Sequence, residues 1–258
     1  MAAPYPAPTR PRSRSTAGVL ADIDARGIHT IMNLGDVIGK GPRGSESVRI
    51  SRERCAVTVR GNWEDFLPVE DPSALGEAAR WWNSELTPDD RKWLRELPLV
   101  HDMVLSGRRI RFFHASAESV HVRVHFRHTE EQFAAMFAAT DLTGPGPEPT
   151  VVGYGDIHVA YPKTSGGRTL FNVGSVGNSL DEPTACYVIL EGVPDGVPSD
   201  PFGLQFVRVA YDIEAEIAAA AELGMPELDA YTIELRTAVY RGRHAELGLT
   251  TGTVDAPT

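Results

Sequence analysis

The chain has 258 residues, 42% of them hydrophobic, and carries a net charge of −10 at pH 7. This length and apolar content fit one large domain that buries its own core and folds alone. The negative charge argues against nucleic acid as a partner, because it repels phosphate backbones, so a phosphate ligand would need a cation. The sequence shows no apolar run that approaches a membrane span, and its two cysteines stand outside any paired motif. We therefore expect a cytoplasmic protein with reduced thiols and no membrane partner.

Helix and strand patterns alternate along the first half of the chain. Residues 1–15 hold four prolines and three arginines, which predicts a disordered or altered N-terminal arm. Residues 15–26 place apolar positions on one helical face, and Gly27 can end that helix in a left-handed conformation. In chain order, the patterns predict a helix over 15–26, a buried strand over 30–34, a strand over 56–60, helices over about 75–86 and from 87, and strands over 100–105 and 109–113.

The second half of the chain is richer in strands. A capping-box pattern, Thr129-Glu-Glu-Gln132, predicts a helix that runs to about Thr140, and a turn rich in proline and glycine follows it. The remaining patterns predict strands over 150–152, 169–172, 185–190 and 203–211, and helices over about 213–223 and 226–239. The chain is therefore predicted to form one domain over residues 16–248, with a disordered tail over 249–258.

Three polar residues stand where predicted strands end. Asp36 follows a glycine and offers two oxygens, so it can bridge two cations, although a turn aspartate is the commoner role for a Gly-Asp pair. Asn62 can give a carbonyl oxygen to a metal and an amide donor to a phosphate, and asparagine also forms turns. His114 leaves an apolar strand and can bind a metal through a ring nitrogen, whereas a hydrogen-bonded core histidine is the more frequent case. Each pattern is weak alone, and their order along the chain carries the argument.

Together with two later segments, these residues resemble the calcineurin-like metallophosphoesterase superfamily, and more closely its bacterial branch of small cytoplasmic phosphoesterases. The similarity covers about residues 17–247 and consists of five short motifs in the order typical of the family. The five segments are Gly35–Gly39, Arg60–Asp65, Phe113–Ser116, Gly155–His158 and Asn172–Gly177. Five motifs in the correct order argue against a chance similarity.

This resemblance implies an α/β fold, a four-layer αββα sandwich of the metallophosphoesterase type, with one or two divalent metals between its sheets. In that scheme Asp36 bridges both metals, and His158 holds the first. The second metal is held by Asn62, His114 and Asp156 together with Asp36, and Asp36, Asn62 and His114 are the catalytic residues. Two such cations can share a hydroxide that attacks phosphorus in line. Manganese, iron, zinc and magnesium all remain open as the metal.

The chain departs from the family pattern at three places. Asp156 stands where the family has histidine, which keeps a ligand but favours a harder cation such as manganese or magnesium. Trp63 takes the place of a histidine found in many relatives, and an indole nitrogen that only donates cannot shuttle a proton. Relatives begin with a strand that ends in Asp-x-His, which residues 1–15 lack. The first strand is therefore predicted to be missing or altered, with reduced stability or a homodimer that covers the exposed sheet edge.

Further polar residues are candidates for contact with the substrate. Arg60, Ser116 and Asn172 can bind phosphate or support the metal ligands, and turn bonding or ordinary surface charge is their alternative role. Lys40, close to Asp36, can attract an anionic substrate or belong to a plain flexible loop. Residues 121–128 carry histidines and arginines at a spacing typical of one strand face, and they either contact the substrate or form a solvated loop. These residues are His121, Arg123, His125, Arg127 and His128.

The motifs predict metal-dependent hydrolysis of a phosphomonoester or a phosphodiester, including dinucleoside polyphosphates, in a phosphorylated small molecule or a nucleotide. The alternative is a catalytically impaired protein of the same fold that binds a ligand or a partner, which the missing Asp-x-His and the Asp156 exchange would favour. A nucleic-acid-binding module is the weakest interpretation, because the chain is acidic and lacks a stripe of basic and aromatic residues.

Overall fold

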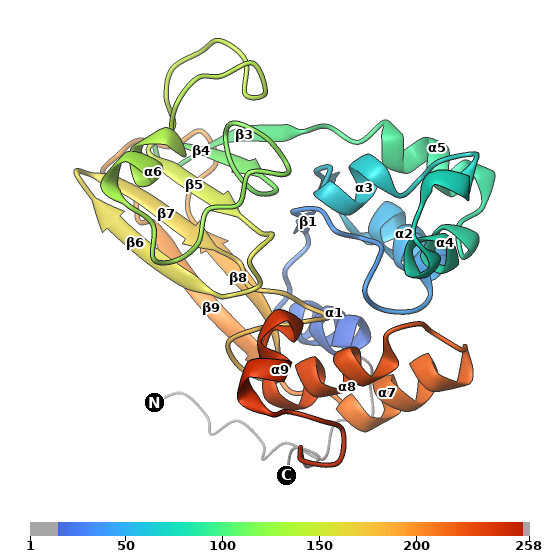
Figure 1. Cartoon of the computed structure of the whole chain (residues 1–258). Coiled ribbons are helices and arrows are strands. Elements are labelled where there is room, and N and C mark those ends of the chain that lie inside the picture. Colours follow the sequence, from blue (N-terminus) through green and yellow to red (C-terminus); the bar gives the residue numbers. More distant parts are fainter. Residues whose placement is uncertain (1–14, 255–258) are drawn as a thin grey trace.

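The computed structural model describes residues 15–254, in which helices flank a large mixed sheet (Figure 1). The N-terminal arm predicted over residues 1–15 lies outside this range, except for Ser15, which begins helix α1 (Ser15–Ala25). The predicted disordered tail is described as far as Val254. Residues 249–254 form hydrogen-bonded turns, and Val254 is buried with its carbonyl oxygen bonded to Arg236. This part of the tail thus contacts helix α8 (Leu228–Thr237) through Arg236.

The largest sheet has five strands in the order β3–β4–β5–β7–β6. Its three central strands run parallel, and each outer strand runs antiparallel to its neighbour. Large side chains such as Ile110, Tyr154 and Leu170 are fully buried, so hydrophobic burial holds this sheet. Because parallel strands carry their carboxyl ends to one edge, the loops after β4, β5 and β7 meet there. The strands are β3 (Val100–Leu105), β4 (Arg108–Phe113), β5 (Val151–Tyr154), β6 (Tyr161–Ser165) and β7 (Arg168–Asn172).

Two smaller sheets have two strands each. The parallel pair is β1 (Met32–Asn33) with β2 (Val57–Thr58), and the antiparallel pair is β8 (Ala185–Glu191) with β9 (Gly203–Val209). Within residues 15–254, neither β1 nor β8 has a second strand beside it. Both strands line one cavity of about 580 Å³, which also reaches Asp36, His114 and His158. The first strand that was predicted to be missing or altered falls on residues outside the described range.

Two groups of helices cover these sheets (Figure 1). Helices α2 to α5 share a core in which Leu67 and Leu94 are fully buried and Trp82 is buried. Helices α1, α7 and α8 share another core with β8 and β9. The remaining bounds are α2 (Gly44–Arg54), α3 (Asn62–Phe66), α4 (Glu77–Ser84), α5 (Pro88–Arg95), α6 (Glu130–Ala135), α7 (Ile213–Glu222) and α9 (His244–Leu247), with short 3-10 helices η1 (Pro72–Ala74) and η2 (Arg241–Arg243). In the part of the chain described, no helix combines the length and apolar character needed to cross a bilayer.

The predicted starts of the helices agree with the structure better than their predicted ends. Thr87 caps α5 where a helix was predicted to begin, and Thr129 caps α6 in the predicted capping box. The helix predicted to reach about Thr140 ends at Ala135, because from Met136 onward the backbone N–H groups bond three residues back instead of four. Helix α2 was not predicted, since its sequence is mostly polar and only its residues near Val48 turn to the core.

Candidate active site

Asp36 is held in an uncommon backbone conformation by the loop that follows β1. Gly35 and Asp36 have φ angles of 91° and 54°, in the left-handed region that residues with a side chain adopt only at a cost. A Cβ atom on Gly35 would lie 2.6 Å from a backbone nitrogen of the neighbouring loop, so glycine is required there. Lys40, Asp156 and His158 share the left-handed conformation, with φ angles of 58°, 62° and 58°. Strain of this kind concentrates where the surrounding structure fixes a functional geometry.

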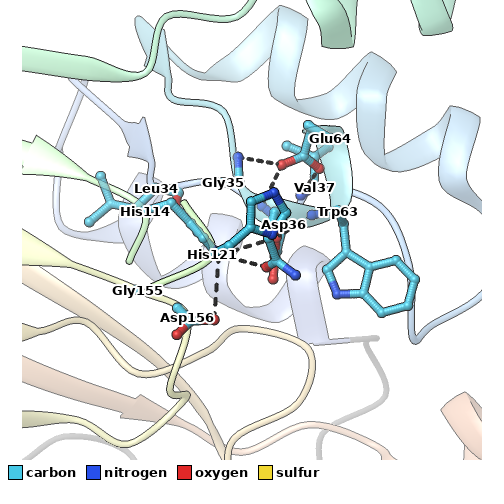
Figure 2. A network of polar contacts seen from close by, with 12 residues as sticks. Leu34, Gly35, Asp36, Val37, Trp63, Glu64, His114, His121, Gly155 and Asp156 are labelled. Atoms are coloured by element: carbon cyan, nitrogen blue, oxygen red, sulfur yellow. Dashed lines mark hydrogen bonds and ion pairs between the residues drawn. The ribbon is translucent and has the colours of Figure 1, made fainter. Parts of the chain in front are cut away.

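Glu64 fixes the position of this loop. Its side chain is fully buried, and its Oε2 accepts N–H bonds from Asp36 and Gly61 at 2.8 Å each. Its Oε1 accepts further bonds from Val37 at 2.8 Å and from Ile38 at 3.3 Å. One carboxylate thus joins the loops that follow β1 and β2 (Figure 2). Burial and the charge of Asp36 raise the pKa of Glu64 to about 7, against the opposing effect of the N–H donors.

His114 follows β4 and directs its imidazole toward Asp36 and Asn62. Its Nδ1 donates to the carbonyl oxygen of Leu34 at 2.7 Å, which leaves Nε2 facing the loops (Figure 2). Nε2 lies 3.3 Å from Asp36 Oδ1 and 3.1 Å from Asn62 Oδ1. Asn62 reaches this point because it is the first residue of α3, directly after the loop that Glu64 holds. The structure therefore brings together the three residues predicted to be catalytic.

The three side chains place polar atoms close to one another. The amide oxygen of Asn62 lies 3.2 Å from both carboxylate oxygens of Asp36, and with the amide turned over, its nitrogen would donate to them and to His114. Oxygens at this separation repel each other unless a proton or a cation stands between them. Burial lowers the pKa of His114, but the charge and hydrogen bond of Asp36 outweigh burial and raise that pKa to about 9. His114 is thus an imidazolium at neutral pH while no other cation is bound.

Asp156 follows β5, and its side chain is only 3% exposed. A single guanidinium takes both of its oxygens, because Arg123 donates from Nε to Oδ2 and from Nη2 to Oδ1, at 2.7 Å each. Asp156 Oδ1 also lies 3.9 Å from His114 Nε2. The predicted metal ligand Asp156 is therefore next to the other three, but it is bound to an arginine.

His158, the remaining predicted metal ligand, is buried and donates from Nδ1 to the backbone oxygen of Asn178 at 2.7 Å. Lys40 donates from Nζ to Oδ1 of the same asparagine at 3.3 Å. Burial and the positive charge of Lys40 lower the pKa of His158 to about 4, so this imidazole is neutral. Asn178 also donates to the buried Glu234 at 3.2 Å, which ties the site to helix α8. Lys40 thus places a positive charge near His158 and Asp36.

The three predicted substrate-binding residues make structural contacts. The guanidinium of Arg60 donates to the carbonyl oxygen of Arg95, at the end of α5. Ser116 bonds within its own turn, and its Oγ donates to the Ser119 oxygen at 3.1 Å. Asn172 is fully buried and donates to the carbonyl oxygen of Gly155, next to Asp156. Of the three, Asn172 alone acts on the site, by fixing the loop that carries Asp156.

Residues 121–128 form turns and irregular backbone rather than a strand, which matches the loop alternative. His121 bonds Asp65 at 2.8 Å, and His128 stacks on Phe133 with ring centroids 5.7 Å apart. Arg123 is the residue of this segment that reaches Asp156, as described above.

Comparison with known proteins identifies the family. Residues 12–193 match the calcineurin-like phosphoesterase superfamily domain. The chain belongs to this superfamily. A relative in sequence, the uncharacterized protein MJ0912 of Methanocaldococcus jannaschii, is 26% identical over 233 residues, which cover 81% of this chain and 87% of that protein.

Two solved structures share the calcineurin-like fold of this chain. The metallophosphoesterase from Sphaerobacter thermophilus is 24% identical with a TM-score of 0.65, over 87% of this chain and 94% of that one. The hypothetical protein PH1004 from Pyrococcus horikoshii OT3 is 13% identical with a TM-score of 0.63, over 88% of this chain and 93% of that one. The predicted fold class is thereby confirmed.

Calcineurin-like phosphoesterases generally use divalent metals, and Asp36, Asn62 and His114 have donor atoms that fit one such ion. Adjacent ligands at about 2.1 Å from an octahedral ion stand about 3.0 Å apart, close to the separations of 3.1, 3.2 and 3.3 Å among these atoms. Across residues 15–254, no three His, Cys, Asp or Glu side chains are arranged to hold a metal ion. With Asp36 and His114, Asp156 would complete such a set of three, but its carboxylate is bound to Arg123. The first of the two predicted metals has Asp36 and His158 as its predicted ligands among the described residues.

Sequence reasoning missed the role of Glu64 and the contact that Arg123 makes with Asp156. Glu64 stands three residues after Gly61, the spacing of a capping box, and that pattern is a usable signal for its role. The contact between Arg123 and Asp156 joins positions 33 residues apart, and no local pattern indicates it.

Proposed function

We propose that this calcineurin-like phosphoesterase hydrolyses a phosphoester with the help of a divalent cation held by Asp36, Asn62 and His114. The supporting observation is the convergence of polar atoms of Asp36, Asn62 and His114 within 3.3 Å of one another, from three separate segments of the chain. A carboxylate, an amide oxygen and an imidazole nitrogen that meet in this way can surround a divalent cation.

The chain's own residues divide the remaining tasks. A divalent cation, when bound, supplies charge to phosphoryl oxygens and lowers the pKa of water. Lys40 places an ammonium beside Asp36 and His158, where it can attract a phosphoryl group. Trp63 packs against Trp82 and Phe66, with ring centroids 5.2 Å apart in both pairs, so it has no part in proton transfer.

The finer assignments are part of the same proposal. A donor set with two carboxylates, Asp36 and Asp156, favours manganese or magnesium. The proposed substrate is a cytoplasmic phosphorylated small molecule or a nucleotide, and the bond is a phosphomonoester or a phosphodiester, including those of dinucleoside polyphosphates. Lys40 and Arg123 support an anionic substrate, because both bring positive charge to the site from separate loops.

Turnover of bis-p-nitrophenyl phosphate and of p-nitrophenyl phosphate with manganese tests this proposal. We expect turnover that falls about a hundredfold or more in Asp36→Asn, because the variant removes the charge of a metal ligand. Asp141→Asn, which neutralises an exposed aspartate after α6, is the matched control and should keep its activity. No turnover with manganese, magnesium, zinc or iron, together with no bound metal, would contradict the proposal.

A second candidate function is binding of a phosphorylated ligand or a partner without turnover. Two observations favour it: Arg123 occupies Asp156, and within residues 15–254 the other metal would have Asp36 and His158 as its predicted ligands. Binding of inorganic phosphate in the presence of a chelator, with no turnover under any metal, would support this candidate over the first.

A homodimer is also proposed. The strands β1 and β8 line a common cavity, and neither has a second neighbouring strand in the described range, so a partner chain could cover their edges. Light scattering that gives the mass of one chain at all concentrations would contradict a homodimer.

A further inference from the structure

Arg123 holds Asp156 with unequal exposure of the two partners. The carboxylate is 3% exposed, whereas the guanidinium side chain is 45% exposed. Two parallel N–H bonds of 2.7 Å each make this a bidentate pair, the strongest geometry that arginine offers to a carboxylate. The buried partner is therefore fixed in place, while the arginine approaches it from the solvent side.

One oxygen of Asp156 lies close to both Arg123 and His114. Oδ1 accepts the bond from Arg123 Nη2 at 2.7 Å and lies 3.9 Å from His114 Nε2. Arg123 thus brings positive charge to the edge of the group formed by Asp36, Asn62 and His114. A cation bound by that group would compete with the guanidinium for the same oxygen.

The segment around Arg123 allows the side chain to move alone. Val124, the next residue, is buried, and its carbonyl oxygen accepts a bond from the Tyr154 hydroxyl at 2.8 Å. Val122, on the other side, is 37% exposed. Because the backbone is anchored at Val124, the guanidinium can leave Asp156 by side-chain rotation, without loss of core packing.

We propose that Arg123 is a displaceable counter-ion of Asp156, and that on release it becomes the residue that binds the phosphoryl group of the substrate. While Asp156 is paired with Arg123, its oxygens are closed to a divalent cation. When Asp156 turns to a cation instead, the freed guanidinium lies at the mouth of the site, and its planar pair of donors matches two phosphoryl oxygens. Both parts rest on the metal site of the proposed function, and neither depends on turnover.

Calorimetric titration of the metal-free protein with manganese tests the competition. Arg123→Gln removes the competing charge, so Asp156 no longer has to leave a guanidinium before it binds the cation. We therefore expect manganese to bind this variant about tenfold more tightly than the wild type. Arg127→Gln is the matched control, since the Arg127 guanidinium lies over the Phe126 ring, 5.4 Å from its centroid. This control should bind manganese as the wild type does. Unchanged or weaker binding in Arg123→Gln, or no binding in any of the three proteins, would overturn the proposal.

Titration of the manganese-loaded proteins with inorganic phosphate tests the second role. We expect Arg123→Gln to lose about tenfold or more in phosphate affinity, and Arg127→Gln to keep it. Equal phosphate affinity in all three proteins would overturn the assignment of Arg123 to the phosphoryl group. Neither titration measures turnover, so a protein that shows both shifts and hydrolyses no phosphoester contradicts the proposed function alone. Thermal melting of each variant verifies that it is folded.

Discussion

Glu64 offers the most demanding test of how the site is built. Its two oxygens accept four backbone N–H bonds, two each: three come from Asp36, Val37 and Ile38, and one comes from Gly61 in the neighbouring loop. Glu64→Gln keeps the shape of the side chain but replaces one oxygen with an amide group that only donates. Two buried backbone N–H groups then face a donor instead of an acceptor.

The expected loss of stability follows from these two groups. A buried donor left without a partner costs about 1–3 kcal/mol, so two cost about 2–6 kcal/mol. For a domain of this size, each kcal/mol lowers the melting temperature by about 2–4 °C, so we expect a decrease on the order of 10 °C. Manganese affinity should fall as well, because Asp36 loses the bond that fixes its backbone.

Thermal melting at pH 8 without metal measures this effect, because Glu64, with a pKa of about 7, is ionised there. Glu118→Gln makes the same chemical change on an exposed side chain and should stay within about 0.5 kcal/mol of the wild type. If Glu64→Gln melts as the control does, the four N–H bonds do not hold the loop, and the account of how Asp36 is positioned fails.

Three further outcomes are expected. The folded-state pKa of about 9 for His114 lies above its ordinary value of 6.5, so its stabilising effect is complete below pH 6.5 and is lost as the pH rises through 9. Melting curves in a chelator should show this loss in the wild type and not in His114→Gln. Asn172→Ala removes the bond to the carbonyl oxygen of Gly155 and leaves the backbone N–H of Gly174 without the Asn172 oxygen that accepts it, so it should cost about 1–3 kcal/mol by denaturant unfolding, and equal stability would refute that role. Gly35→Ala should lose roughly 2 kcal/mol or more and bind manganese weakly by calorimetry, and wild-type binding there would show that the loop tolerates a side chain.

The sequence allowed prediction of those parts of the site that depend on strand ends. The apolar strands that precede His114 and Asp156 are β4 and β5, which run parallel in the largest sheet. Their carboxyl ends must therefore meet at one edge, and the residues that follow them lie close together. The capping patterns at Thr87 and Thr129 were readable for a similar reason, since they depend on residues three positions apart.

Contacts between distant segments were not predictable in this way. Arg123 was recognised only as a candidate for the substrate, because its bond to Asp156 depends on how an irregular loop folds over β5. Helix α2 lacked a clear apolar face, and tertiary contacts at Val48 decide its structure. Arg60 was a candidate for contact with phosphate, but its side chain turns to the end of α5.

The most direct test of the central claim is a manganese titration of the metal-free protein in which bound metal and turnover of bis-p-nitrophenyl phosphate are measured on the same samples. We predict that turnover rises in proportion to metal bound at the group of Asp36, Asn62 and His114, and that Asp36→Asn loses both together. Full turnover in a chelator, or metal binding that Asp36→Asn leaves unchanged, would contradict the claim that these three residues form the active metal site.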